Sequence, residues 1–428
     1  MRASLSVLKF FFKVYFIGSI RSVLLSLFGS KVNRNEWDSR ILIVYLQAIG
    51  DNAILTSVLK HYRSAFPDQK IYFLFKDNLG LENAIRPFVD SIIGLSYKKF
   101  VSNPFYGLSF INRLRKTGFK TVINHDHSPA EISGKIISLS LNAEKVVGYE
   151  GFGIGLRKPF NANIKRNIQF SIKKLYPKFD LIIPSLDKES ALKNSFKSLI
   201  EHYIYFFEEV TGYQKEDYAT QLYLNDDDEK VIKTTLAKEK IELNQYAVLN
   251  LGSSASWRSW PVERFAKSSE IFKTNNLHVV LIGAPGEEYL GERFKKLYSG
   301  KALDLIGKIS ISQSLSVIKS SLLVFTNDTS STHLAIALKK PTLSILSGGS
   351  GNSASFYGYK DINVWIRKEL ACLGDNWQCA ANLSPGEIAP CIDAIDIISI
   401  NTALKNLLSY LKSNPNHPRE RFTSSFFK

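Results

Sequence analysis

The stretch from residue 325 to residue 338 has the clearest potential for chemistry. An apolar run leads into Asp328, and hydroxyl residues then open a helix rich in alanine and leucine. The free N–H groups and the positive dipole end of such a helix bind anions. Capping by Thr329 or Ser330 is the simpler alternative, but a cap uses one hydroxyl rather than four. The stretch predicts a ligand site, open to a diphosphate, made by Asp328, Thr329, Ser330, Ser331, Thr332 and His333.

A second loop rich in hydrogen-bond donors follows the apolar run at 246–251. Gly252 permits a tight turn, and Ser253 and Ser254 offer donors. Arg258 supplies a planar fork of N–H groups that suits a phosphate, and Pro261 begins a helix well. A plain loop with an exposed arginine is the alternative. We expect this loop to contact the donor diphosphate.

Asp51 is the candidate for proton transfer. It follows Gly50 in the first strand-to-helix loop, which in a parallel α/β sheet faces the ligand cleft. A carboxylate among apolar neighbours can have a raised pKa and act as a general base. A helix-capping aspartate would need no such role, so the spacing alone leaves both open. We assign Asp51 the catalytic role and place Gly50 on the acceptor side, where the proton-donating substrate would lie.

Two weaker groups of polar residues also follow apolar runs. Glu287 and Glu288 come after a Gly/Pro turn, where an acid can accept hydrogen bonds from ribose hydroxyls. His125, Asp126 and His127 could hold a metal, contact the acceptor or form a plain polar loop. We expect Glu287 or Glu288 to contact the ribose of a nucleotide and Asp126 to lie on the same side as Gly50, beside the proton-donating substrate.

The elements that must position these residues alternate between short apolar runs and helical patterns. Continuous apolar runs are typical of strands buried on both faces of a parallel sheet. The first half has runs at 41–46, 71–75, 91–95, 121–124 and 145–149, and the second at 246–251, 278–283, 302–306, 322–326, 342–346 and 362–366. This alternation predicts an α/β protein with two Rossmann-like, doubly wound domains that face a cleft.

The domain boundaries follow from changes in this pattern. Residues 1–35 are a basic amphipathic segment, and 36–225 and 226–400 are two Rossmann-like domains, which the resemblance described below makes the acceptor domain and the nucleotide-sugar donor domain. Residues 401–428 hold a last helix at 401–411 and a polar basic tail at 412–428, and we expect this tail to be mobile. The Lys-rich and aromatic stretch from about 160 to 215 differs from the rest of its domain.

The composition limits the class of protein and its partners. The chain has 428 residues, and its 55 Lys and Arg against 39 Asp and Glu give a net charge of +16, which suits an anionic partner. No helix-turn-helix, zinc-finger or RNA-binding signature accompanies this charge, so we expect no nucleic-acid partner. Cys372, Cys379 and Cys391 fit a reducing compartment as buried thiols, with a metal site as the alternative.

The first 30 residues are strongly apolar but contain basic residues. Lys9, Lys13 and Arg21 divide the segment, so that no uncharged apolar run is long enough to span a bilayer. Basic residues gather on one side of the helical pattern and large apolar ones on the other, with Ile20 as an exception. This pattern favours a helix lying in an anionic membrane surface over a core helix, a signal peptide or a spanning segment.

Taken in order, these motifs resemble glycosyltransferase family 9, the lipopolysaccharide heptosyltransferases with the GT-B fold. The loop with Gly50 and Asp51 looks like the first family motif, and Arg258-Ser-Trp260-Pro261 looks like its basic-x-Trp-Pro element. The stretch from Asp328 to Ala335, with Lys340-Pro341-Thr342, looks like the donor signature. The resemblance covers roughly residues 40–400. Arg258, often Lys in the family, and the serines at 330 and 331, where Gly is usual, depart from the pattern.

The resemblance implies an inverting transfer of a heptose-like sugar from a nucleotide diphosphate sugar, usually ADP-heptose. The acceptor would be a lipopolysaccharide core or a related phosphorylated, lipid-linked saccharide, at the cytoplasmic face of the bacterial inner membrane. Asp51 would be the base, Arg258 a diphosphate contact, Asp328 a sugar-hydroxyl contact and Glu287 or Glu288 a nucleotide contact.

The fixed donors around the diphosphate can act without a metal, and no Asp-x-Asp stands at a strand end. We therefore expect a metal-independent enzyme with no cofactor. The changed turn residues Ser330 and Ser331 motivate an alternative, a membrane-attached binding protein on a degenerate transferase scaffold.

Overall fold

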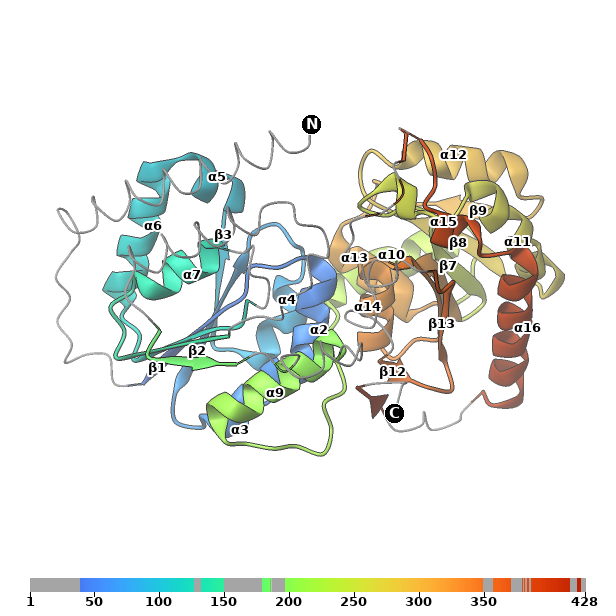
Figure 1. Cartoon of the computed structure of the whole chain (residues 1–428). Coiled ribbons are helices and arrows are strands. Elements are labelled where there is room, and N and C mark those ends of the chain that lie inside the picture. The colour runs from blue at the N-terminus through green and yellow to red at the C-terminus, as the bar shows by residue number, and fades with distance from the viewer. Residues whose placement is uncertain are drawn as a thin grey trace.

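The computed structural model describes residues 39–126, 132–149, 179–184, 186, 197–348, 357–370, 379, 381, 383–384, 386–415 and 422–424. The described part contains two six-stranded parallel sheets, one in each half of the chain (Figure 1). The amphipathic segment predicted at 1–35 lies outside the described residues.

The first sheet, sheet A, has the strand order β3-β2-β1-β4-β5-β6. Its strands are β1 (Arg40–Val44), β2 (Lys70–Lys76), β3 (Ser91–Leu95), β4 (Thr121–Asn124), β5 (Lys145–Tyr149) and β6 (Leu181–Ile183). Its helices are α2 (Ile49–Leu59), α3 (Tyr62–Ala65), α4 (Glu82–Ile85), α5 (Tyr97–Ser102), α6 (Pro104–Thr117), α7 (Ile132–Leu139) and α9 (Leu199–Thr211). The order is that of a Rossmann fold, with the direction of winding reversed between β1 and β4.

The second sheet, sheet B, repeats this topology in the order β13-β11-β10-β7-β8-β9. Its strands are β7 (Tyr246–Asn250), β8 (His278–Ile282), β9 (Ala302–Asp304), β10 (Leu323–Asn327), β11 (Thr342–Leu346) and β13 (Asn363–Arg367). Its helices are α10 (Asp226–Lys238), α11 (Val262–Thr274), α12 (Glu288–Leu297), α13 (Ile311–Lys319), α14 (Ser330–Ala337), α15 (Pro390–Asp393) and α16 (Ile397–Ser413). Here the winding reverses between β7 and β10, and the predicted fold of two Rossmann-like domains is confirmed.

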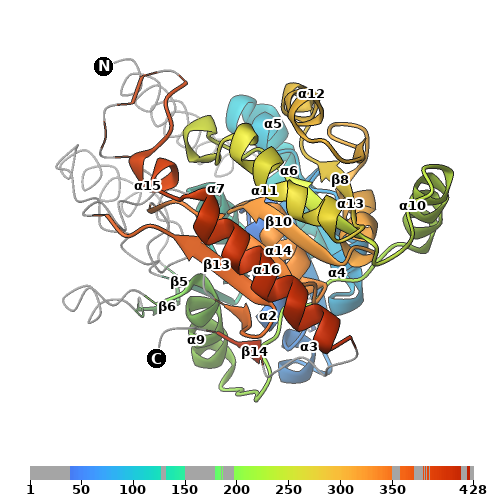
Figure 2. The same ribbon diagram turned by 90° about the vertical axis from the view of Figure 1, so that its right-hand side faces the viewer.

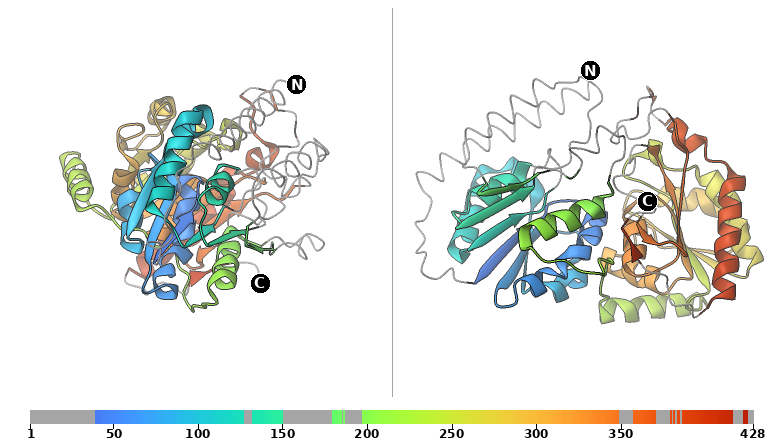
Figure 3. Two further views of the ribbon diagram at one scale, coloured as in Figure 1. Left: turned by 90° about the vertical axis from the view of Figure 1, so that its left-hand side faces the viewer. Right: turned by 60° about the horizontal axis from the view of Figure 1, so that its bottom comes forward.

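Three apolar clusters separate the layers. One packs α5, α6 and α7 against the outer face of sheet A, and another packs α11, α12, α15 and α16 against the outer face of sheet B. Figure 2 shows α16 crossing sheet B beside α11. The third cluster is continuous from sheet A through α2 and α9 to α14 and sheet B, so the two domains share one apolar layer. Figure 3 shows α16 on the far side of sheet B from this layer.

The last helix and residues 422–424 pack against the rest of the protein. Ile400, Leu404 and Leu407 of α16 are buried in the core of the second domain. Beyond the helix, β14 (Phe422–Thr423) pairs with β12 (Gly358–Tyr359), and the Ser198 hydroxyl donates to the Ser424 carbonyl at 2.7 Å. Residues 422–424 therefore contact both halves of the chain, and the mobility of the tail stays a prediction.

Candidate active site

The predicted site residues follow the central strands of the two sheets. The loop with Asp51 follows β1 and Asp126 follows β4, the two strands at the winding reversal of sheet A. The loop with Arg258 follows β7 and Asp328 follows β10, the equivalent strands of sheet B. Ligands of doubly wound folds bind at the carboxyl ends of these strands. In each domain, the predicted residues therefore lie together at the carboxyl edge of the sheet.

Asp51 lies in the first turn of α2 and is partly buried. Its Oδ2 accepts a hydrogen bond from the Ala48 N–H at 3.3 Å, so the side chain does close the start of the helix. Burial raises the pKa of Asp51 to about 6, although the Ala48 N–H and the Lys76 charge act in the opposite direction. A carboxylate with this pKa is ionised at neutral pH yet basic enough to accept a proton during a reaction.

Asp328 stands at the start of the loop between β10 and α14, with 8% of its side chain exposed. Burial raises the pKa of Asp328 to about 7, and the Asp51 charge raises it further while the Arg258 charge lowers it. Its Oδ2 is buried with no hydrogen-bond partner in the described part of the chain. Asp328 therefore has acceptor capacity for a ligand hydroxyl and lies within electrostatic range of Asp51.

Thr329 and two hydroxyl residues in the first turn of α14 make hydrogen bonds within their own domain. Thr329 caps the helix by accepting from the Ser331 N–H at 3.3 Å. The Ser331 hydroxyl accepts from the Asn250 amide at 2.8 Å, and Thr332 shares a 3.0 Å hydrogen bond with Ser344. Capping therefore accounts for Thr329 alone, whereas Ser331 and Thr332 hold the start of α14 against the neighbouring strands β7 and β11.

Arg258 ends a short 3-10 helix in the loop after β7. Its guanidinium donates to the Ser254 hydroxyl at 2.5 Å and lies 5.9 Å from the centre of the Trp257 ring. The Ser253 hydroxyl donates to the Ala255 carbonyl at 2.6 Å, so this side chain shapes the loop. Burial lowers the pKa of Arg258, and the Asp328 charge opposes this effect.

Glu287 lies against the loop that carries Ser253, and Glu288 does not. Glu287 accepts from the Ala284 N–H at 2.9 Å, and a Cβ at Gly252 would lie 2.1 Å from its Oε1. Gly252 is thus required for this close approach. Burial raises the pKa of Glu287. Glu288 instead accepts a hydrogen bond from the Gly286 N–H through its Oε2, at 2.8 Å.

The two halves of the site meet where α2 contacts α14 (Figure 1). A Cβ at Gly50 would lie 2.7 Å from Cδ2 of His333, so the two helices are in direct contact here. The His333 ring is stacked on Tyr357 and shares a 2.8 Å hydrogen bond with its hydroxyl. Burial lowers the pKa of His333 to about 4, so the imidazole is neutral at pH 7.

Asp126 is buried and organises the loop before Asp51. Its Oδ1 accepts from the Leu46 N–H at 2.9 Å and from the Gln47 side chain at 3.0 Å. His125 is also buried and shares a 2.9 Å hydrogen bond with the Tyr62 hydroxyl, while His127 lies outside the described residues. The structure thus gives Asp126 a supporting position, and its contact with an acceptor stays a prediction.

Sequence reasoning missed several residues that shape the site. Tyr45 and Tyr203 join their hydroxyls in a buried pair, and the nearby Asp51 charge contributes to the raised pKa of each. Asn327 donates to the Leu251 carbonyl at 2.8 Å and accepts from the Trp260 N–H at 2.9 Å, which fixes the Arg258 loop. These contacts join residues far apart in the chain, so no local pattern indicates them.

In the described ranges, no three His, Cys, Asp or Glu side chains come together in a way that could hold a metal ion. Cys391 is buried and accepts from the Gly348 N–H, and Cys379 is partly buried, while Cys372 lies outside the described residues. Within the same ranges, every helix is too short or too polar to cross a bilayer.

Comparison with known proteins agrees with the resemblance drawn from the motifs. A model of glycosyltransferase family 9 (heptosyltransferase) matches residues 181–378, which include the Arg258 loop and the Asp328 loop. The resemblance to that family is therefore confirmed for the second half of the chain. Asp51 lies outside the matched residues. No curated protein matches the sequence.

Solved structures show the same fold over most of the chain. A glycosyl transferase family 9 protein from Veillonella parvula aligns with a TM-score of 0.69 at 16% identity, covering 88% of this chain and 100% of its own. The E. coli ADP-heptose lps heptosyltransferase II aligns at 0.61 and 14% identity, covering 88% and 99%. E. coli heptosyltransferase WaaC with ADP-2-deoxy-2-fluoro heptose aligns at 0.56 and 15% identity, covering 86% and 99%.

Proposed function

We propose that this chain, a heptosyltransferase-like glycosyltransferase, moves a heptose-like sugar from ADP-heptose to a lipopolysaccharide core or a related lipid-linked glycan, with inversion at the anomeric carbon. The family match supports the class of reaction. The E. coli structure of similar fold that holds ADP-2-deoxy-2-fluoro heptose supports the choice of donor.

The observation that carries this proposal is the arrangement of two carboxylates from different domains. Asp51 and Asp328 follow the central strands of sheets A and B, and the Asp51 charge raises the pKa of Asp328. Gly50 and His333 are in contact beside them. A sugar held by Asp328 would therefore have its reacting carbon within reach of an acceptor held near Asp51.

In the proposed reaction, Asp51 removes the proton from an acceptor hydroxyl. The hydroxyl oxygen forms a bond to the anomeric carbon as the bond from that carbon to the diphosphate breaks. The proton ends on Asp51, and ADP leaves with the bonding electrons. A carboxylate whose pKa is about 6 suits this role, because it is ionised before the step and basic enough to hold the proton after it.

The leaving diphosphate would be stabilised by fixed charges and dipoles of the second domain. Arg258 offers a guanidinium fork, and the first N–H groups of α14 point out of the helix beyond Asp328. Ser254, Ser330 and Glu287 complete the donor side, with Glu287 placed to accept from the nucleotide ribose. Such preorganised groups do not reorganise during the reaction, and we propose that it needs neither metal nor cofactor.

We also propose that the protein works at the cytoplasmic face of a bacterial inner membrane. The basic and apolar pattern of residues 1–35 supports a helix in the membrane interface, and the net charge of +16 supports attraction to anionic lipids and a phosphorylated acceptor. Deletion of residues 1–35 should move the protein from the membrane to the soluble fraction. Equal membrane partitioning of the truncated and full-length proteins would contradict the proposed anchoring role of residues 1–35.

A donor screen tests the proposed function. ADP-sugars and UDP-sugars are titrated by calorimetry, and each binder is then incubated with lipid-linked saccharide while products are followed by mass spectrometry. We expect ADP-heptose to bind and to be consumed with transfer of its sugar. Tight binding without turnover would instead favour the degenerate binding protein, and preference for a UDP-sugar would overturn the donor assignment.

A further inference from the structure

The first domain contains a long stretch of sequence with only basic charges. Asp90 and Asp126 enclose 35 residues without any acidic side chain. This stretch has six basic residues, Lys98, Lys99, Arg113, Arg115, Lys116 and Lys120. It forms β3, α5, α6 and β4, so its positive charge is concentrated on one hairpin of helices rather than spread through the fold.

Most of these charges lie on the outer side of α5 and α6. Lys98, Lys99, Arg113 and Lys116 are exposed, whereas Arg115 is buried and donates to the Ser140 carbonyl at 2.6 Å. The exposed basic residues therefore lie outside the core, and the Arg113 guanidinium packs over the Phe110 ring, 5.0 Å from its centre. They face away from sheet A, since the inner side of α6 packs on that sheet.

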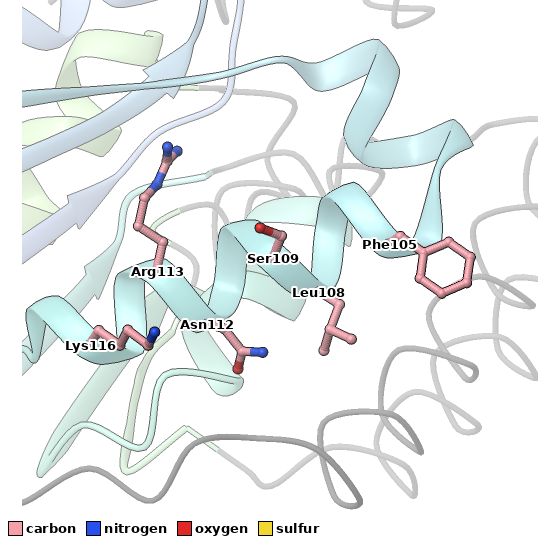
Figure 4. A pocket seen from close by; sticks show the side chains of 6 residues that line it. All are labelled: Phe105, Leu108, Ser109, Asn112, Arg113 and Lys116. Carbon is pink, nitrogen blue, oxygen red and sulfur yellow. The ribbon is translucent and has the colours of Figure 1, made fainter.

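An apolar group accompanies these charges. Phe105, in the first turn of α6, is 76% exposed. Figure 4 shows an open pocket along this helix, lined by Phe105, Leu108, Ser109, Asn112, Arg113 and Lys116. Phe105 extends from one end of the row and Lys116 lies at the other. We call Lys98, Lys99, Phe105, Leu108, Arg113 and Lys116 the α5–α6 surface.

The α5–α6 surface adjoins the point where the N-terminal segment joins the fold. The Arg40 guanidinium donates to the Thr117 carbonyl at the end of α6, and the Lys120 N–H donates to the Arg40 carbonyl at 3.0 Å. Arg40 begins β1 and follows the basic amphipathic segment by a few residues. A membrane that held residues 1–35 would thus already be near the basic end of α6.

The other end of the surface is on the catalytic edge of the domain. Because β3 leads into α5 and α6, Phe105 lies at the carboxyl edge of sheet A, the edge from which the Asp51 loop also leaves. The surface lies on the opposite face of sheet A from α2, which contacts the second domain. A bilayer on this surface would leave the junction of the domains free.

We propose that the α5–α6 surface docks on an anionic phospholipid bilayer, as a second attachment point beside residues 1–35. Exposed lysines and arginines are attracted to anionic headgroups, and the exposed Phe105, with the partly buried Leu108 beside it, can enter the headgroup boundary. The aliphatic Leu108 beside Phe105, and the position next to the end of the basic amphipathic segment, favour a lipid surface over nucleic acid. This inference extends the membrane attachment proposed above and does not depend on the identity of the sugar.

The test uses the full-length chain and vesicles of phosphatidylcholine with or without phosphatidylglycerol. The double variant Arg113→Gln/Lys116→Gln should bind the anionic vesicles about 25-fold more weakly, from about five-fold for each charge. Phe105→Ser should also weaken binding. The matched control, Lys267→Gln/Lys405→Gln, removes two exposed lysines from α11 and α16 of the second domain and should bind like the unaltered protein.

Several results would overturn the inference. Vesicle binding by Arg113→Gln/Lys116→Gln equal to that of the unaltered chain would do so, as would equal losses in the matched control. Unchanged vesicle binding with a loss of affinity for RNA, or for a soluble phosphorylated saccharide, would assign the surface to that ligand instead. Transfer to a soluble acceptor is measured in parallel, so failure of membrane docking is distinguished from failure of the proposed activity.

Discussion

Substitution of Gly50 by alanine tests how closely the two domains approach. The new Cβ would lie 2.7 Å from Cδ2 of His333, against about 3.4 Å for an ordinary contact, so the helices must separate by about 0.7 Å. His333 has little freedom to withdraw, because it is buried, stacked on Tyr357 and hydrogen-bonded to it. Overpacking of this kind costs about 1–3 kcal/mol, which corresponds to about a 5- to 150-fold loss in kcat/KM if closure of the domains bears the cost.

If the contact between Gly50 and His333 is unimportant, Gly50→Ala should be as stable as the unaltered protein or more stable, with unchanged activity. Gly50 lies in the first turn of a helix, where alanine alone would stabilise the fold by up to about 1 kcal/mol. We would measure kcat/KM for sugar transfer together with thermal unfolding. Gly94→Ala, on the edge strand β3 with Asp77 at 3.2 Å, is the matched control and should keep full activity. A Gly50→Ala variant with kcat/KM within two-fold of the control would refute the reasoning.

Three further predictions concern the donor side. Asp328→Asn should gain stability relative to the unaltered protein, by about 1–3 kcal/mol in chemical denaturation, as the pH rises from 4 to 8. The reason is that the folded-state pKa of about 7 makes the unaltered protein lose stability as the pH rises toward and through that value, whereas asparagine does not ionise. A stability difference that stays constant with pH would argue against a raised pKa. Arg258→Ala should weaken ADP binding about 10- to 100-fold by calorimetry, with partial rescue by Arg258→Lys, whereas Arg293→Ala in a surface ion pair should have no effect. Transfer should persist in EDTA, and its loss with recovery on addition of Mg²⁺ would contradict the metal-free scheme.

Much of the fold was predictable because its strands are buried on both faces. Runs such as Ile41–Leu46 and Leu322–Thr326 are apolar without alternation, which is the pattern of parallel sheets. The three-residue β6 was missed because Leu181 and Ile182 are 37% and 49% exposed and lie in a Lys-rich stretch. The pairing of β12 with β14 joins residues more than 60 positions apart, so no local periodicity reports it.

The candidate site was predictable in its positions but less so in its contacts. The carboxyl ends of strands identified the loops of Asp51 and Asp328, because parallel sheets bring such ends to one edge. The sequence could not show that Ser331 and Thr332 bind neighbouring strands or that Asp126 supports a loop, because each partner is distant in the chain. Nor could spacing alone decide between a base and a cap for Asp51, which makes the capping hydrogen bond and also has a raised pKa.

The pH dependence of turnover in Asp51→Asn tests the role of Asp51 as the base most directly. In the unaltered protein, kcat should fall about tenfold from its plateau to pH 5, following a pKa of about 6. Asp51→Asn should retain ADP binding, lower kcat by about 10²- to 10⁴-fold and lose this acidic limb. Asp68→Asn, an exposed aspartate of the same domain, should behave like the unaltered protein. Near-normal turnover in Asp51→Asn, or an unchanged acidic limb, would contradict the account.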